Sequence, residues 1–293
     1  MLSLEELRRR ISSVSDMQSV VSLMKTMAAV SVRQYDAAAD AMAEYDNVVS
    51  LGLHALLREH PVVPPRRAVS ASSIGVVILG SDQGLCGQFN DDTVKYAAAD
   101  SVVSESTDIR SVVIGARAAS RLAENSRPME RRLRVPATVA EITTLLQDLM
   151  PHILAWQDDG VERIVVYFNR RESVASYVPS KLQLLPLTDE YLERCRSMKW
   201  ESRSLPMLGA EWQPLFAATI RQYLFSGLFR VCAESRACEN ASRITAMQAA
   251  EKNIDRRLTE LRSSFNTSRQ TVITEELLDV VTGFEALTQS PPS

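Results

Sequence analysis

Residues 1–60 read MLSLEELRRRISSVSDMQSVVSLMKTMAAVSVRQYDAAADAMAEYDNVVSLGLHALLREH, with no proline and a single glycine, Gly52. Proline breaks a helix interior because it lacks an N–H and clashes with the preceding turn. Ser3 stands three residues before Glu6, which matches the capping box at the start of many helices. The stretch therefore predicts one helix of about 55 residues, several times the length of a usual globular helix.

The apolar residues of this stretch follow alternating steps of three and four. Such a walk passes through Leu4, Leu7, Ile11, Val14, Gln18, Val21, Lys25, Ala28, Val32, Tyr35, Ala39, Met42, Asp46, Val49, Leu53 and Leu56. A seam sustained over more than three or four heptads is typical of a coiled coil. Gln18, Lys25 and Asp46 interrupt the seam. They either fix the register of the paired helices, at a cost in stability, or face solvent at a wide or frayed contact.

The other end of the chain is equally poor in helix breakers. Residues 215–290 contain no proline and only the glycines Gly227 and Gly283. Apolar residues recur there at helical spacing, namely Ile244, Met247, Ile254, Leu258, Leu261, Phe265, Val272 and Ile273. The pattern drifts near Ser268. It predicts a second helix of about 70 residues, which most simply pairs antiparallel with the first in a coiled coil.

Ten of the 12 prolines lie between Pro61 and Pro214, and this middle part has a different pattern. Apolar runs at 74–79, 109–114 and 161–168 predict strands, and 91–104, 116–124 and 139–157 predict helices. A further strand at 176–187 is expected to form a hairpin with the third through Asn169 and Arg170, and 189–214 is expected to be a loop. Strands that alternate with helices predict a mostly parallel sheet.

The predicted fold class is α/β plus coiled coil. Residues 1–60 form an N-terminal coiled-coil helix, 61–214 an inserted Rossmann-like α/β domain, and 215–293 a C-terminal coiled-coil helix. This arrangement alone also suits a tethering protein built on an antiparallel coiled coil.

Composition argues against several functional classes. The net charge of −3 gives no basic arm for nucleic acid. No run of 18 apolar residues predicts a membrane span, and the N-terminus does not resemble a signal peptide. The four cysteines form no CxxC pair and, with only three histidines, predict neither a disulfide framework nor a metal site. We expect no cofactor and a cytosolic protein.

The loop Ser81–Asn90 follows the first predicted strand and contains two glycines. Phosphate groups bind at strand-to-helix loops of this kind, so a nucleotide-binding α/β enzyme using this loop is one alternative. The sequence contains neither GxxxxGK[ST] nor GxGxxG. The other interpretation is a tight turn in which Asn90 or Asp91 caps the next helix. No histidine lies near Cys86 to activate it.

Three stretches carry a family resemblance. Residues 7–14 and 24–29 resemble a basic opening followed by an MK-MVAA stretch. Residues 81–90 resemble SDRGLCGGFN, and 273–283 resemble I-T-x-E-x-x-[DE]-x-x-x-G after an A-R-Q-like Ser268-Arg269-Gln270. In these motifs, spaced along nearly the whole chain, the sequence resembles the gamma subunit of the F-type ATP synthase family. The matching positions include Ser81, Asp82, Gly84, Leu85, Cys86, Gly87, Asn90, Ile273, Asp279 and Gly283.

The resemblance implies a bacterial central-stalk rotor subunit with no active site, metal or cofactor of its own. One copy would couple ion translocation to ATP synthesis or hydrolysis. Its partners would be the alpha and beta subunits of the hexamer, the epsilon subunit and the ring of c subunits, at the cytoplasmic face of the inner (plasma) membrane. Contacts with partners are expected from Arg269, Gln270, Thr274 and Glu275. Lys25 is expected either to touch a beta carboxylate or to lie on a solvated helix face.

Some positions depart from the family pattern. Gln83 replaces an arginine, Gln88 replaces a glycine, Phe284 follows Gly283 where alanine is usual, and residues 30–35 are less basic than expected. These departures indicate a divergent member, and an alternate or sodium-translocating form stays open. The choice of ion, the direction of the reaction and inhibition by epsilon stay open too, since the ion-binding carboxylate would lie on another subunit.

Overall fold

The computed structural model describes residues 3–60, 73–125, 128–173, 176–200, 204 and 209–288, the last six by their backbone alone. The chain divides into two compact units. One comprises Met1–Met27 and Ala246–Ser293, and the other comprises Ala28–Thr245. The predicted boundary at residue 61 falls outside the described residues.

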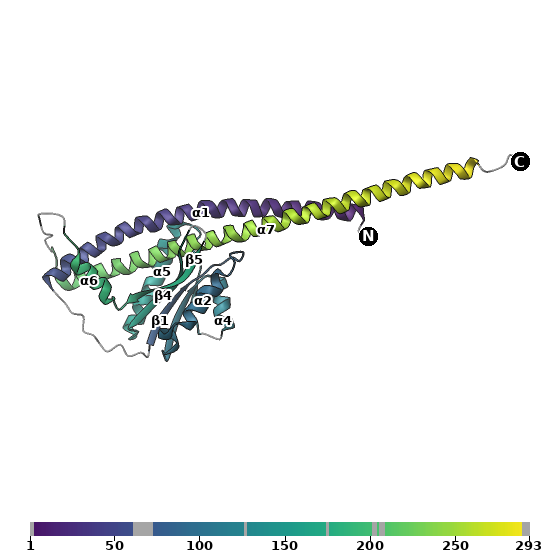
Figure 1. The fold of residues 1–293 in the computed structure, drawn as a ribbon. Coiled ribbons are helices and arrows are strands. Elements are labelled where there is room, and N and C mark those ends of the chain that lie inside the picture. The colour runs from purple at the N-terminus through teal and green to yellow at the C-terminus, as the bar shows by residue number, and fades with distance from the viewer. Residues whose placement is uncertain are drawn as a thin grey trace. The chain divides into compact units, whose positions relative to one another are not determined.

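Two long helices, α1 (Leu4–Glu59) and α7 (Trp212–Thr288), contribute to both units (Figure 1). Their 56 and 77 residues confirm the prediction of two very long helices. Ser3 Oγ accepts a hydrogen bond from the backbone N–H of Glu6 at 3.2 Å, which confirms the N-cap. Helix α7 begins earlier than the predicted residue 215, because Pro214 lies in its first turn, where the missing N–H costs no intrahelical bond.

The seam predicted for α1 is present, since all sixteen of its positions are buried or half-buried. In the first unit Gln18 bonds to Asp255, Lys25 pairs with Glu251, and the Arg8 guanidinium lies over the Phe265 ring. Partner numbers on α7 fall as numbers on α1 rise, so the two helices are antiparallel, as predicted.

The second unit contains, within its described residues, a five-stranded sheet of order β3-β2-β1-β4-β5. The strands are β1 (Ser73–Leu79), β2 (Asp108–Ile114), β3 (Arg131–Leu133), β4 (Arg163–Arg171) and β5 (Tyr177–Leu185). Strand β5 runs antiparallel to β4, and the other pairs are parallel. The mostly parallel, Rossmann-like sheet is therefore confirmed.

Helices cover both faces of this sheet (Figure 1). Alternate side chains of β1, such as Val76 and Ile78, pack in a cluster with α2 (Phe89–Ala99), α3 (Ser101–Ser104) and α4 (Ala116–Glu124). Val77 and Leu79 join the cluster that contains α5 (Val139–Asp158) and the second-unit parts of α1 and α7. The sheet thus rests directly on the paired long helices.

Several local predictions were wrong. Residues 189–197 form a helix, α6 (Asp189–Ser197), and not a loop, because Thr188 Oγ1 caps it by accepting from the Tyr191 N–H at 3.2 Å. Strand β4 continues through Asn169 and Arg170, and the hairpin turns after Arg171. The helix predicted at 91–104 is interrupted at Asp100, which caps α3. Strand β3, only three residues long, was missed.

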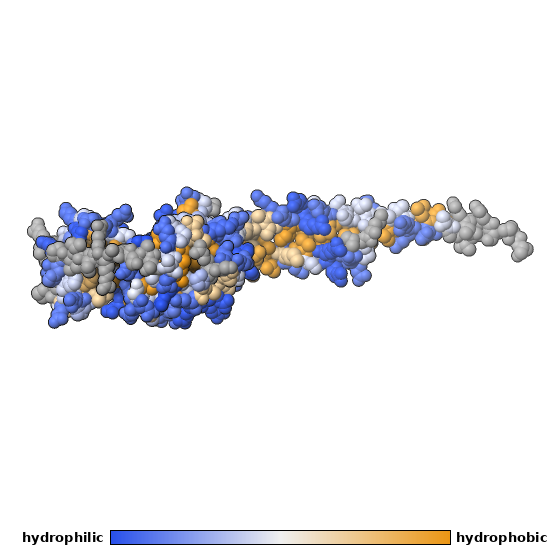
Figure 2. All heavy atoms as spheres, turned by 90° about the horizontal axis from the view of Figure 1, so that it is seen from below, coloured by the Kyte–Doolittle hydropathy of each residue, from blue (hydrophilic) through white to orange (hydrophobic). Residues whose placement is uncertain are grey.

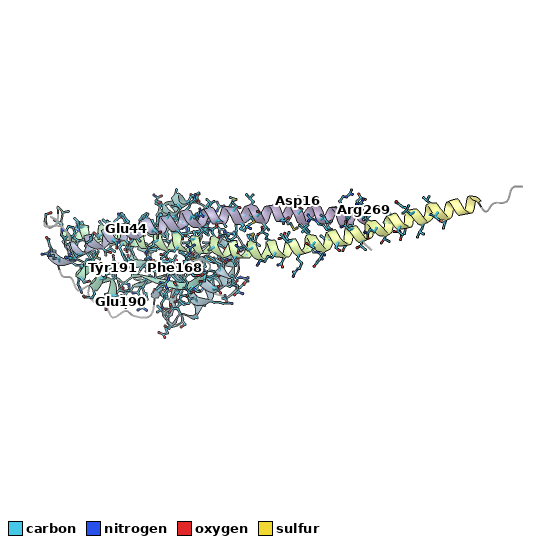
Figure 3. The ribbon with its side chains drawn as sticks, turned by 45° about the horizontal axis from the view of Figure 1, so that its top comes forward. Asp16, Glu44, Phe168, Glu190, Tyr191 and Arg269 are labelled. Carbon is cyan, nitrogen blue, oxygen red and sulfur yellow. The ribbon has the colours of Figure 1, made fainter. Side chains whose placement is uncertain are left out.

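Helix α6 contacts both α1 and α7 within the second unit. The Tyr191 ring, labelled in Figure 3, lies 4.6 Å from the Tyr223 ring of α7, and its hydroxyl bonds to Ser50 of α1 at 3.1 Å. Asp46, the third polar seam residue, accepts a hydrogen bond from Ser226 at 3.0 Å. Its seam position is therefore filled by a polar contact between the long helices.

Candidate functional site

The loop Ser81–Asn90 lies at the carboxyl end of β1, between β1 and α2. Strand β1 has β2 on one side and β4 on the other, so the order of strands reverses there. In open α/β sheets this switch point is where a crevice binds ligands. The nucleotide hypothesis therefore depends on what occupies this place.

The polar side chains of the loop bond to the chain itself. Asn90 Oδ1 accepts from the Ser81 N–H at 2.8 Å, and Asn90 Nδ2 donates to Ser81 Oγ at 2.8 Å. The two carboxylate oxygens of Asp82 accept from the N–H groups of Ala116 and Val135, at 2.8 and 2.9 Å. The expected capping of α2 by Asn90 or Asp91 was wrong, since its N-cap is Gln88, which makes no side-chain cap.

Helix α7 approaches the same loop. Ser242 Oγ donates to the Cys86 carbonyl at 2.6 Å, and Cys238 packs in a buried cluster with Cys86 and Phe89. Gly87 has φ +60°, and a Cβ there would lie 3.4 Å from Ser242 Oγ. A Cβ at Gly80, just before the loop, would lie 2.2 Å from Cβ of Ala118. The loop thus contacts α7 directly, through Ser242 and Cys238, and its polar side chains are engaged within the chain.

The surroundings of Cys86 disfavour the reactive thiolate form of its side chain. Its side chain is buried, and burial raises the pKa of the thiol, so the thiolate that would attack is scarce at neutral pH. Among the described residues, no group of three or more histidine, cysteine and acidic side chains is placed to hold a metal ion.

Leu85 and Gly84 lie at the outer side of the loop. Leu85 has φ +63° with 62% of its surface exposed, although a bulky side chain at positive φ is unusual. A Cβ at Gly84 would meet only the Arg117 side chain, at ordinary contact distance.

In the first unit, the polar seam residues of α1 pair with acidic residues of α7. Lys25 Nζ lies 2.5 Å from Glu251 Oε2, and Gln18 Nε2 donates to Asp255 Oδ1 at 2.6 Å. Lys25 thus has an acidic partner within its own chain. Sequence reasoning missed Glu251, although Met247, Ile254, Leu258 and Leu261 place residue 251 in the same heptad series.

The remaining candidate residues lie at the end of α7. Every residue from Arg269 to Thr282 is exposed, which includes Gln270, Ile273, Thr274, Glu275 and Asp279. Arg269 is labelled on α7 in Figure 3. Thr274 Oγ1 donates a hydrogen bond to the Gln270 carbonyl, one turn earlier, at 2.8 Å. Gly283 continues the helical backbone. These side chains are free to meet another molecule, whereas the loop residues are engaged within the second unit.

Large apolar side chains are exposed in the first unit as well (Figure 2). On α1 they are Met17, Val20, Leu23 and Met27, and on α7 they are Val272, Ile273, Leu277, Leu278, Val280 and Val281. We call these two sets the α1 stripe and the α7 tip. Exposed apolar surface of this extent marks an interaction surface.

Comparison with known proteins decides the family. Residues 3–287 match the family model described as ATP synthase. The ATP synthase gamma chain of a Cyanothece species is 30% identical, with 98% of this chain and all of that one covered. The chain belongs to the ATP synthase gamma-chain family. The gamma chain of Granulibacter bethesdensis is also 30% identical over 98% of this chain and its own full length, and that of Nostoc punctiforme is 29% identical with the same coverage.

Solved structures share the fold of this gamma chain. A chain from the rotor of the Euglena gracilis mitochondrial ATP synthase has a TM-score of 0.63 at 14% identity, covering 92% of this chain and 98% of its own. One from the central stalk and c-ring of the Tetrahymena thermophila enzyme has a TM-score of 0.57 at 20% identity, covering 79% and 99%.

Membership in the family decides between the functional alternatives. A gamma chain is the central-stalk rotor subunit of ATP synthase, peripheral to the membrane, and catalysis takes place on the beta subunits. The nucleotide-binding enzyme and the unrelated tethering protein are thereby set aside. Among the described residues, no helix has both the length and the hydropathy needed to cross a bilayer.

Proposed function

We propose that this gamma chain couples ion flow through a ring of c subunits to ATP synthesis or hydrolysis in a hexamer of alpha and beta subunits, with epsilon as a further partner. One copy serves each complex, at the cytoplasmic face of the inner (plasma) membrane. Its inserted domain comes between the two coiled-coil helices in the chain, α1 (Leu4–Glu59) and α7 (Trp212–Thr288). Family membership and the fold shared with rotor chains support this role.

The observation that carries the proposal is the exposed apolar surface of the first unit. The α1 stripe and the α7 tip leave side chains such as Leu23, Leu277 and Val280 61%, 62% and 70% exposed. Apolar surface of this kind is stabilised when a partner removes it from water. An apolar sleeve at the centre of a hexamer of alpha and beta subunits would cover it while permitting rotation.

Polar residues of the same region provide the specific contacts. Arg269 and Gln270 would bond to a loop of one beta subunit, and Thr274 and Glu275 would contribute further polar contacts. Because a ligand shifts a conformational equilibrium only through contacts that differ between states, a single chain with different faces would drive the three beta subunits in turn.

The proposal is tested by isolating tagged chain from cells that express it with its own partners. Alpha, beta, epsilon and c subunits should co-purify, with one copy of the tagged chain, while the chain alone hydrolyses no ATP. Replacing Leu277 and Val280 with Asp should sharply reduce recovery of alpha and beta. Asp at Ser263 and Asn266, exposed polar positions of the same helix, is the matched control. ATP turnover by the chain alone, or equal recovery with both variants, would contradict the proposal.

A further inference from the structure

The three polar seam residues of α1 share one heptad position. Gln18 and Lys25 are seven residues apart, and Asp46 follows Lys25 after three more heptads. The alternate seam positions, from Leu7 to Leu56, are apolar throughout. Each polar residue reaches a polar side chain of α7: Asp255, Glu251 and Ser226, respectively. A solvated helix face would not require a partner at each of these positions.

Lys25 and Glu251 both occupy seam positions, one on each helix. In the first unit the seam of α7 contains Met247, Glu251, Ile254, Leu258 and Leu261, at alternating steps of four and three. Glu251 is therefore a seam residue like Lys25, and their side chains are only 29% and 31% exposed. One ion pair thus lies within the seam, one heptad from the polar contact between Gln18 and Asp255.

Sliding α7 along α1 would separate this pair. A slip of one heptad would place Lys25 opposite Ile244 or Leu258, both apolar. A one-turn slip toward Met247 would have the same effect. A one-turn slip the other way would give Lys25 a new partner in Asp255 but would leave Gln18 near Thr259. Burying a charge without its partner is costly, whereas an all-apolar seam would tolerate slips more readily.

We propose that Lys25 and Glu251, with Gln18 and Asp255 beside them, lock the register of the two rotor helices. This inference rests on the proposed rotor function and gives Lys25 a role inside the shaft in place of a beta contact. The lock resists sliding of one helix along the other under torque. Lys25 and Glu251 are positioning residues, since they act by holding α7 in one register against α1.

The test uses the assembled membrane-bound synthase, in which ATP hydrolysis and ATP-driven ion pumping are measured on the same preparation. Lys25→Glu and Glu251→Lys, each alone, should lower the ratio of pumping to hydrolysis at least about threefold, in line with the energies of directly interacting charges. The double variant K25E/E251K, which restores opposite charges, should return the ratio close to that of the wild type. Lys252→Glu, an exposed neighbour of Glu251, should leave the ratio unchanged.

A second variant separates the effect of a lost register from the effect of a less stable coiled coil. Lys25→Met with Glu251→Leu makes this pair of positions apolar, so the complex should assemble normally and yet lose coupling. Failure of K25E/E251K to recover, or a severe defect for K25E with none for E251K, would overturn the lock and assign Lys25 to a partner contact. If the wild-type chain assembled with no synthase subunits, the rotor function itself would fail, which is a separate outcome.

Discussion

Leu85 is strained and exposed at the same time, with φ +63° and 62% of its surface in solvent. The left-handed conformation costs an ordinary residue roughly 1–2 kcal/mol, while asparagine tolerates it. Leu85→Asn should therefore stabilise the isolated chain by up to about 1 kcal/mol, measured by urea denaturation. Leu23→Asn, at a leucine that is 61% exposed in a helix, should instead destabilise it slightly. Loss of stability in Leu85→Asn would mean that the leucine packs favourably after all.

The sequence identified the residues of this loop but not their contacts. Ser81, Asp82 and Asn90 were recognised from a motif, whereas their partners, such as Val135 and Ser242, lie far away along the chain. The spacing of residues in the sequence does not indicate which distant backbone N–H group will donate a hydrogen bond to a given carboxylate. The capping role expected of Asn90 was wrong because its side chain bonds back to Ser81 instead.

At the scale of elements, the long helices depend on an uninterrupted seam. Leu261, 5% exposed, lies in the seam of α7 far from either helix end. Leu261→Pro should cost roughly 3 kcal/mol or more, because it removes a hydrogen bond and clashes with the preceding turn. Circular dichroism and denaturation of the full chain measure the loss. Glu5→Pro is the control, since it lies in the first turn of α1, where proline is tolerated. Equal losses of helicity in the two variants would argue against a continuous helix through Leu261.

The elements that the sequence predicted best are those with long periodic patterns. The seam from Leu4 to Leu56 repeats often enough to exclude other structures, and the apolar strand runs are bounded by glycine, charged or polar residues. Strand β3 and helix α6 are too short for periodicity to identify. Proline was a reliable breaker except at helix starts, as for Pro214, and inside α5, whose Pro151 lies within the helix.

On the scale of the whole molecule, substitutions at the exposed end of α7 can separate an effect on contacts with partners from an effect on the folding of this chain. Residues 269–282 are all exposed, so changes there remove little from the packing of the first unit. Substitutions in the loop Ser81–Asn90 or in the seam should instead affect the folding of the chain itself, because the side chains there are engaged within the chain. A variant at the end of α7 can therefore fail in the assembled enzyme while the isolated chain stays fully folded.

Replacing Arg269 and Gln270 together with alanine tests this distinction. A hydrogen bond involving a charged group contributes roughly 1.5–3 kcal/mol, so losing a contact to a beta subunit should lower ATP turnover more than about tenfold. The complex should still assemble, because the apolar α7 tip and α1 stripe are untouched, and the denaturation midpoint of the isolated chain should not move. Arg256→Ala, at an arginine exposed on the same helix and bonded to Asn253 of its own chain, should keep near-normal turnover. If R269A/Q270A also assembled with unchanged turnover, Arg269 and Gln270 would face solvent in the working enzyme, and the contacts that drive the beta subunits would have to come from other residues.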